Sequence, residues 1–314
     1  MPDPITIHVS QPLTDFSVAH FMEPDAYVAR RAAPVVNVPK QIDKYFVYSR
    51  ADLLSTYAQK RAPGTAAAIR DFNLTTASYY IPVNAVAAAI SEQDRANADA
   101  AIDLEEDFVK VLIQDIKIAE EVAFAATAFT TSGWGTNGAP SVTWENAASY
   151  PLTDITTGIR TVQANTGRMP NCLLLGAETY YSGLLLHPDI VERLPDNAPR
   201  IITTGFLATL LGFDDVLVAT AGYNSAIEGA TASYASILGD NALIYYRNPS
   251  PGRMSPTAMA TFVWSGLAGM QSGLRVQRED IPSKDALPLI TVESAAAVKI
   301  ISTELGYNFY TCIT

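Results

Sequence analysis

Residues 91–128, SEQDRANADAAIDLEEDFVKVLIQDIKIAEEVAFAATA, decide the fold, because they contain neither proline nor glycine. They open with Ser91-Glu92-Gln93-Asp94, in which a serine is followed three residues later by an acid, as in a helix capping box. Apolar residues then recur every three or four positions, as on a helix that lies on a core. We therefore predict one long helix over about 92–128. Its apolar stripe is Ala101, Leu104, Phe108, Leu112, Ile116, Ala119, Ala123 and Ala126.

At about 1.5 Å per residue, this helix would span roughly 50 Å, which favours a flat or elongated subunit. It is also strongly acidic. Ten acids between Glu92 and Glu121, offset by three bases, contribute −7 of the chain's formal net charge of −11. Two interpretations stay open, a solvated face and an interface with a basic partner. A catalytic carboxylate pair is a remote third, because no histidine, lysine or metal motif supports the acids.

Residues 45–82 are predicted to form an extended β-hairpin loop. Two β-rich stretches, 45–48 and 72–81, flank Arg61-Ala62-Pro63-Gly64-Thr65, whose Pro-Gly pair is a turn signal. A short helix within 51–60 also fits the pattern. Because residues 40–71 are basic, the hairpin would complement the acidic helix of a neighbouring subunit. The predicted inter-subunit contacts are Arg50, Lys60, Arg61, Arg70, Asp103, Glu106 and Asp107.

Residues 1–44 are predicted to form an N-terminal arm. They contain six prolines, which suppress long helices and central strands. Short apolar pieces such as Val35-Val36 are suited to adding to another surface. An isolated two-stranded hairpin is marginal in water, and an arm has little core of its own. We therefore expect both the arm and the hairpin loop to be stabilised mainly by other subunits.

The residues after the long helix change pattern twice. The Gly-rich stretch 132–140 marks a boundary, and residues 144–250 then alternate helical and strand patterns, as in an α/β domain. Thr153-Asp154 is expected to cap a helix that ends near Gly167. Further helices are expected over 177–186 and 203–211, and strands over 172–176, 216–219 and 242–246. After residue 251 only strands are expected, around 262–264, 274–276, 288–292, 297–301 and 308–311.

The composition excludes several classes of protein. With 48 % apolar and 17 % charged residues among 314, the chain is not of the disordered type. Its acidic balance argues against sequence-independent nucleic-acid binding, which needs clustered Lys and Arg. No apolar stretch approaches the roughly 18 residues of a membrane span. Its two cysteines, Cys172 and Cys312, form no disulfide framework and predict reduced thiols in a protein made in the cytoplasm.

Motifs for chemistry are missing from the sequence. It contains no G-x-S-x-G elbow, and neither cysteine is close in sequence to a histidine. The glycines near Trp134 lack the P-loop lysine. No His or Cys pair has metal-ligand spacing, and His187 before Pro188 is best interpreted as a helix stop. We therefore predict no catalytic residue, no metal and no cofactor.

The order of these elements, together with four local motifs, resembles a tailed-bacteriophage major capsid protein of the Hong Kong 97 type. Residues 61–65 followed by Tyr79-Tyr80 resemble the extended loop of such proteins. Residues 168–176, RMPNCLLLG, resemble their Pro-Asn segment followed by an apolar strand. Residues 186–190, LHPDI, resemble a downstream step, and 203–218, a helix ending in LLGFDDVLV, also fits.

This resemblance covers nearly the whole chain and implies an α+β, Hong Kong 97-like capsid fold. It implies an N-terminal arm over 1–44 and an extended loop over 45–82. A peripheral domain would comprise 83–143 and 251–296 and hold the long spine helix. An α/β axial domain would comprise 144–250, and C-terminal strands over 297–314 would return to it.

The implied function is a major capsid protein that self-assembles, as hexamers and pentamers, into an icosahedral shell. The shell would enclose double-stranded DNA without sequence-specific contact, and the protein would be located in the virion after synthesis in the host bacterial cytoplasm. A portal is an expected partner, and a decoration protein is left open. Because no long scaffolding-like region precedes the hairpin, a separate scaffolding protein is expected.

Two other functions remain as alternatives to a phage shell. An encapsulin-like nanocompartment uses the same fold to enclose cargo enzymes, and gene neighbours or particle contents would distinguish it. A metabolic enzyme with a site within 154–246 is the remote alternative, because that region has no acid–base or cofactor motif.

Overall fold

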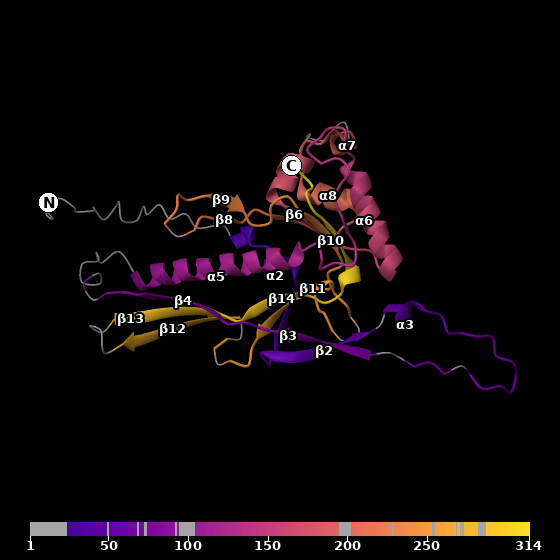
Figure 1. The fold of residues 1–314 in the computed structure, drawn as a ribbon, viewed down its shortest axis with the longest axis horizontal. Helices are drawn as coiled ribbons and strands as arrows, with labels where there is room; N and C mark the ends of the chain where they lie inside the picture. Colours follow the sequence, from indigo (N-terminus) through magenta and orange to yellow (C-terminus); the bar gives the residue numbers. More distant parts are fainter. Residues whose placement is uncertain are drawn as a thin grey trace.

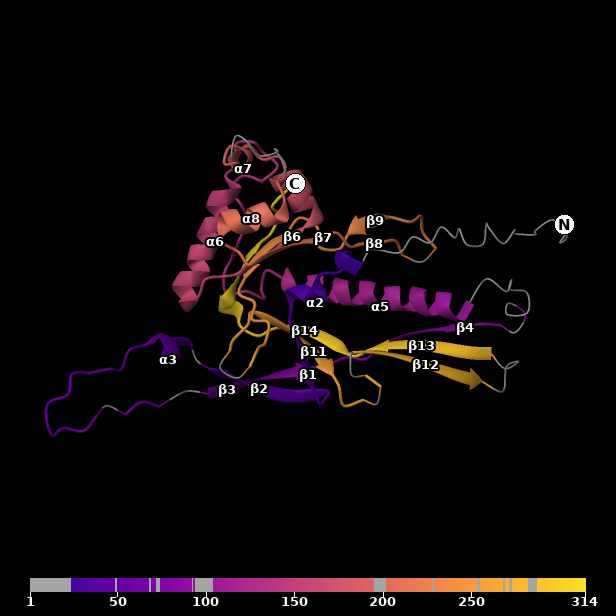
Figure 2. The same cartoon turned by 180° about the vertical axis from the view of Figure 1, so that it is seen from behind.

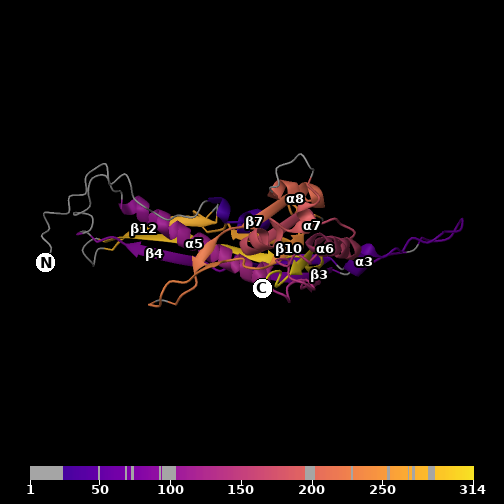
Figure 3. The same ribbon diagram turned by 90° about the horizontal axis from the view of Figure 1, so that it is seen from above.

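The computed structural model describes residues 24–314, apart from 49, 68, 72–73, 92, 94–103, 195–201, 228, 253–254, 268, 271–272 and 282–286. Figure 1 shows an elongated subunit in which one long helix, α5 (Leu104–Ala128), lies along layers of strands. A triangular α/β unit stands over one end of α5. Seen from above, the body is narrow and the loop around α3 (Arg50–Leu54) projects beyond it (Figure 3).

The long helix is present, and its 25 described residues start with three acids in the first turn, where they favour the helix dipole. Residue 92 and residues 94–103 of the predicted span, including two of the four capping-box residues, lie outside the described residues. The buried apolar residues of α5 are spaced by four or eight positions, namely Leu112, Ile116, Phe124 and Ala128, and Glu121 is buried with them. The predicted stripe is therefore wrong at Phe108, which is 37 % exposed, and at its C-terminal end, where Ala119, Ala123 and Ala126 are exposed. Alanines bury little apolar area, so the larger Phe124 ring sets the buried face.

Two small sheets lie against α5 (Figure 2). In the first, β13 (Leu287–Ser294) pairs antiparallel with both β12 (Leu274–Ile281) and β4 (Asn84–Ala89). In the second, β11 (Met259–Trp264) pairs antiparallel with β14 (Ala296–Ile300) and parallel with β1 (Val35–Val38). Leu112 and Ile116 of α5 pack on Ile290 and Val292 of β13. The long helix thus covers one face of the first sheet.

The α/β unit is built on a five-stranded sheet in the order β5-β15-β10-β6-β7. The strand β6 (Cys172–Gly176) is buried at every position and runs parallel to β7 (Asp215–Ala219). The other strands are β5 (Asn137–Gly138), β10 (Ala242–Tyr245) and β15 (Gly306–Phe309), and the helices are α6 (Pro151–Thr166), η3 (Thr179–Leu184), α7 (Pro188–Val191) and α8 (Thr204–Leu211).

Several predictions inside this unit are confirmed. The Thr203 hydroxyl accepts a hydrogen bond from the Phe206 N–H at the start of α8, and Gly212 ends that helix with φ +73°. Gly167 ends α6 in the same left-handed conformation. Gly176 is required where β6 passes the 239 turn, because a Cβ there would lie 1.9 Å from the Gly239 carbonyl oxygen.

Three expectations need correction. The helix α6 begins at Pro151, which suits a first helical position, whereas Asp154 accepts a hydrogen bond from the Trp144 indole at 3.0 Å instead of capping the helix. Residues 179–184 form a π-helix within the expected helix. The strand β14 does not return to the five-stranded sheet. It stays beside β11, where Val298 and Ile300 pack against the core, and only β15 joins the α/β sheet.

The N-terminal segment lies on its own chain from residue 24 onward. A 3-10 turn, η2 (Pro24–Ala26), and a one-turn helix, α2 (Ala29–Ala32), lead into β1. Val28, Ala29, Ala32 and Ala33 are all at most 5 % exposed and belong to the core between α5 and the α/β sheet. The expectation that this arm is stabilised mainly by other subunits is therefore wrong for these residues. Residues 1–23 lie outside the described residues.

The extended hairpin is present. Its strands, β2 (Ile42–Tyr48) and β3 (Leu74–Tyr80), pair antiparallel over seven residues each, with Ile42 opposite Tyr80. The short helix α3 follows β2, and the Pro63-Gly64 turn closes with the Thr65 N–H donating to the Ala62 carbonyl at 3.2 Å. A second, smaller hairpin, β8 (Gly222–Asn224) and β9 (Tyr234–Ser236), extends from the α/β unit along α5 (Figure 1).

Candidate assembly surfaces

The extended hairpin has one face on its own chain and one face in solvent. On the inner face, the Tyr79 ring stacks on Phe262 with centroids 4.7 Å apart and is 7 % exposed. On the outer face, apolar side chains stand at the alternate positions that strand geometry dictates. We call these four residues the outer stripe: Ile42, Phe46, Leu74 and Tyr80, which are 42–62 % exposed. The outer stripe was not predicted from the sequence, because Lys44 lies on the same strand face between Ile42 and Phe46 and interrupts the apolar pattern.

The tip of the hairpin is basic and open to solvent. Lys60 and Arg61 are exposed, and no ion pair joins either side chain to a residue that the structure describes. The guanidinium of Arg70 lies 4.7 Å from the centre of the Tyr57 ring. Arg50 differs, because it donates to Glu304 of its own chain at 2.8 Å. Of the predicted basic contacts, Lys60 and Arg61 therefore offer the charge most accessible to a partner.

The acids of the long helix divide into two groups. Glu106 and Asp107 are more than 60 % exposed and lie 2.9 and 3.8 Å from Lys110. Asp103 lies outside the described residues. Glu105 pairs with Arg278 at 2.8 Å. Some acids of the long helix are thus exposed to solvent, whereas Glu105 forms an ion pair with another part of the same chain.

Glu120 and Glu121 bind the N-terminal segment. Arg30 donates to the Glu120 carboxylate at 2.9 Å, and Ser294 also donates to it. Glu121 is 1 % exposed and accepts hydrogen bonds from the backbone N–H groups of Val28 and Ala29, each at 3.0 Å. Burial raises the pKa of Glu121, although the two N–H bonds act in the opposite direction.

The base of the hairpin borders a groove with a volume of about 960 Å³. It is lined by residues of β2 and α3, by residues 301–305, and by 251–252 and 255–257. Most of the lining is apolar. Its charged members are the Arg50–Glu304 pair and Arg168, whose guanidinium lies 5.2 Å from the centre of the Tyr246 ring. The groove is suited to packing against protein and offers little for chemistry on a small molecule.

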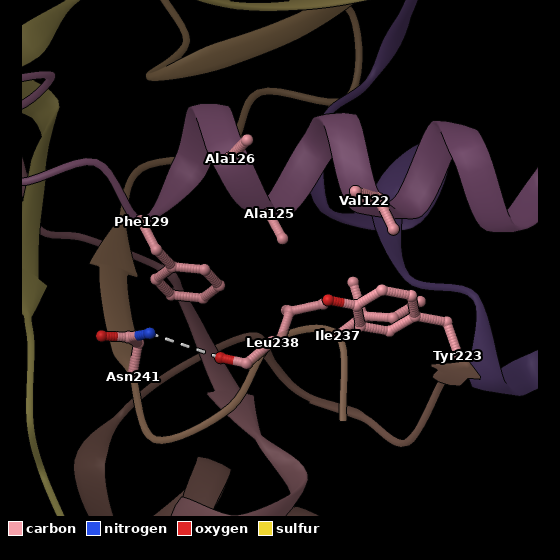
Figure 4. A pocket seen from close by; sticks show the side chains of 8 residues that line it. All are labelled: Val122, Ala125, Ala126, Phe129, Tyr223, Ile237, Leu238 and Asn241. Atoms are coloured by element: carbon pink, nitrogen blue, oxygen red, sulfur yellow. Dashed lines mark hydrogen bonds between the residues drawn. The ribbon is translucent and has the colours of Figure 1, made fainter. Parts of the chain in front are cut away.

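A smaller pocket of about 260 Å³ lies between α5 and the base of the β8–β9 hairpin (Figure 4). Its one side-chain amide, Asn241, already donates to the Leu238 carbonyl at 3.4 Å. No carboxylate, imidazole, amine or thiol is among the residues that line it, so it offers mainly apolar contact beside the Tyr223 phenol and the Asn241 amide. The lining residues are Val122, Ala125, Ala126, Phe129, Tyr223, Ile237, Leu238 and Asn241.

The α/β unit contains one pair that resembles a catalytic dyad. The Ser149 hydroxyl lies 3.0 Å from His187 Nε2. His187 Nδ1, however, accepts the backbone N–H of Asp189 at 3.2 Å, so the ring proton belongs on Nε2. An Nε2 that carries the proton donates to Ser149 or to the Asn146 carbonyl, 3.1 Å away, and does not act as the base for the serine. His187 instead caps α7, in agreement with its interpretation as a helix stop.

The two cysteines and the possible metal ligands of the described residues also form no site for chemistry. Both cysteines are buried, and burial raises the pKa of Cys172 to about 12 and also raises that of Cys312, which keeps these thiols protonated. Within the described part of the chain, no three His, Cys, Asp or Glu side chains gather as a metal site would require. None of the described helices combines the length and apolarity needed to cross a bilayer.

Comparison with known proteins gives fold relatives only. No protein-family model matches the chain, and no curated protein matches it. A phage-related protein from Bordetella bronchiseptica RB50 superposes with a TM-score of 0.71 at 21 % identity, over 93 % of both chains. The capsid of Myoviridae phage XM1 gives 0.58 at 14 % identity, over 96 % of this chain and 95 % of that one. The SrpI encapsulin of Synechococcus elongatus PCC 7942 gives 0.50 at 12 % identity, over 94 % and 90 %.

These superpositions extend over nine-tenths or more of each chain, so they take in the long helix, the small sheets and the α/β unit together. At such low identities they establish the fold. The resemblance predicted from the sequence motifs is thereby confirmed at the level of architecture: the chain has the mixed α and β fold of Hong Kong 97-like capsid subunits.

Proposed function

We propose that this chain is the major capsid protein of a tailed phage, which self-assembles into an icosahedral shell around double-stranded DNA. The observation that carries the proposal is the superposition over nine-tenths or more of both chains with a phage-related protein and a phage capsid. Closed shells follow from heterologous contacts whose rotations close into rings. Pentamers and hexamers of this chain are the rings that the proposal requires.

The assembly contacts are proposed to lie on the projecting hairpin. Its outer stripe offers exposed apolar area, and Lys60 and Arg61 offer positive charge near the tip. The exposed acids Glu106 and Asp107 on α5 of a neighbouring copy carry the complementary charge. Arg50, Arg70 and Asp103 remain proposed contacts as well, although Arg50 already pairs with Glu304 in the same chain.

The direct test of the DNA-enclosing role is the content of the particle. Shells isolated from phage-producing cells are treated with nuclease, opened and analysed for nucleic acid and protein. Protected double-stranded DNA of uniform length supports the proposal. Shells that carry one foreign enzyme and no protected DNA would instead establish the encapsulin-like alternative. That alternative is retained because the chain also superposes on an encapsulin.

The proposed partners follow from the same function. They are further copies of this chain, a portal, a separate scaffolding protein and packaged DNA held without sequence-specific contact, with an outer decoration protein as an optional addition. The proposed location is the virion, after synthesis in the host bacterial cytoplasm. No enzymatic role is proposed, since capsid subunits are structural and the Ser149–His187 pair lacks a free base.

A further inference from the structure

The N-terminal segment 28–33 lies at the junction of three parts of the molecule. Its alanines are small enough to let the backbone approach α5, β10 and β11 closely, and Ala32 and Ala33 are fully buried. Phe124 of α5 and Tyr245 of β10 belong to the same core cluster. The segment is therefore placed to hold these parts in one arrangement.

Side chains from all three parts bind the backbone of this segment. From α5, the Glu121 carboxylate accepts the N–H groups of Val28 and Ala29. From the α/β unit, the Tyr245 hydroxyl donates to the Ala32 carbonyl at 3.0 Å, and Arg247 donates to the Arg31 carbonyl at 2.8 Å. From β11, the Thr261 hydroxyl donates to the Ala33 carbonyl at 3.1 Å.

These bonds use the groups that a one-turn helix leaves unsatisfied at its two ends. The N–H groups at the start of α2 point to the long helix, and the carbonyls at its end point to the α/β unit and to β11. Because both ends are buried, moving α5 away from the α/β unit would leave polar groups unpaired on one side or the other. Breaking the hydrogen bonds at one end of α2 while keeping those at the other end would therefore leave buried polar groups unpaired, which is unfavourable.

We propose that residues 28–33 are a strap that locks the α/β unit to the long helix, so that a change in their relative orientation requires the strap to release. The strap is a conformational device inside one subunit and does not depend on what the shell contains. Its prediction is that removing a bond at the C-terminal end of the strap, from either the α/β unit or β11, loosens the bonds to α5 at its N-terminal end.

Hydrogen exchange on the full-length chain tests this coupling. Tyr245→Phe removes the hydroxyl and leaves the ring, and Thr261→Val removes the hydroxyl at the same volume. The probes are the amides of Val28 and Ala29, which face Glu121 and not the altered residues. Each substitution is expected to speed their exchange by about tenfold, the effect of losing one buried hydrogen bond on a shared opening.

The matched control is Tyr180→Phe, which removes another buried tyrosine hydroxyl bond, to the Ile202 carbonyl at 2.8 Å, away from the strap. It should leave exchange at Val28 and Ala29 unchanged. The proposal is overturned if Tyr245→Phe and Thr261→Val also leave these two amides unchanged, or if Tyr180→Phe speeds them equally. Because Thr261 and Tyr245 lie on different elements, a folding defect in one variant leaves the other as the test.

Discussion

The N-terminal segment 24–38 and the hairpin loop 50–71 invite comparison, because the sequence predicts that both are stabilised mainly by other subunits. In the structure, the N-terminal segment packs in the core, where Ala32 is fully buried. The hairpin loop is exposed to solvent, and Ile69 is 92 % exposed. Prolines limit regular structure but do not decide burial. A segment can be buried when side chains elsewhere in the chain form hydrogen bonds with its backbone N–H and carbonyl groups. Glu121 and Tyr245 do this for the N-terminal segment.

Two adjacent tyrosines give the largest expected contrast between own-chain packing and solvent exposure. Tyr79→Ala should lower the free energy of unfolding of the unassembled chain by about 3 kcal/mol, because the ring is buried against Phe262. Tyr80→Ala, one residue on and 60 % exposed, should change it by less than about 0.5 kcal/mol. Chemical denaturation measures both values.

The same pair distinguishes folding from assembly. Tyr80→Ala should reduce the yield of shells in sedimentation, since it removes part of the outer stripe. If Tyr80→Ala assembles as well as the unaltered chain, the outer stripe is not an assembly surface. Equal unfolding free energies for the two variants would contradict the assignment of the hairpin's inner face.

Enlarging an alanine in each region gives a second contrast. Ala32→Leu should destabilise the unassembled chain by about 1–3 kcal/mol, because overpacking displaces the strap from α5. Ala66→Leu makes the same change in the exposed loop and should be nearly neutral. Thermal and chemical unfolding measure the difference. A neutral Ala32→Leu would mean that the strap does not occupy the core.

The pH dependence of Glu121 gives a third contrast, with a defined sign. Burial raises its pKa in the folded chain above the ordinary value of 4.5. Its contribution to stability is therefore fully present below that ordinary value and is lost as the pH rises through the raised one. The free-energy difference between the unaltered chain and Glu121→Gln should shrink as the pH increases from 4.5 towards neutrality.

Glu106→Gln is the control, because Glu106 is exposed and its contact with Lys110 is solvated. It should give a small difference with little change over the same pH range. A Glu121 difference that grows with pH would show that the two backbone N–H bonds outweigh burial, contrary to the sign given above.

Charge reversal at the loop tip is expected to have the smallest effect per pair. Exposed ion pairs contribute about 0–1 kcal/mol each. The double variant Arg61→Glu with Arg70→Glu should therefore affect assembly only because the same contact is repeated between all neighbouring subunits of a pentamer or hexamer. Shell yield should fall at low salt and differ less at high salt, where screening weakens the contact. Arg160→Glu, an exposed site on α6, controls for net charge. Unchanged yield at low salt would assign docking to the outer stripe alone.

Local signals in the sequence predict much of the fold. The helix over about 203–211, the end of α6 at Gly167, the buried β6 strand and the Pro63-Gly64 turn all depend on neighbours within a few residues. The long helix is predicted for the same reason, since its periodicity is local. The whole-chain order of these elements then identifies the fold through a family resemblance.

What the sequence does not predict depends on distant partners. Glu121 has the pattern of a solvated acid, and only the fold brings it to backbone N–H groups 92 and 93 residues earlier in the chain. The placement of β14 beside β11 and the solvent face of the hairpin depend equally on tertiary pairing. Contacts between subunits are harder still to predict from the sequence, because they involve a second chain.

The most direct test of the central claim, that this chain builds a shell, is electron microscopy of the purified full-length protein at assembling concentrations, with its sedimentation coefficient measured in parallel. We predict closed particles with clusters of five and six subunits. A chain that stays monomeric, with the hydrodynamic radius of a single subunit in both the lysate and the purified sample, would contradict the account.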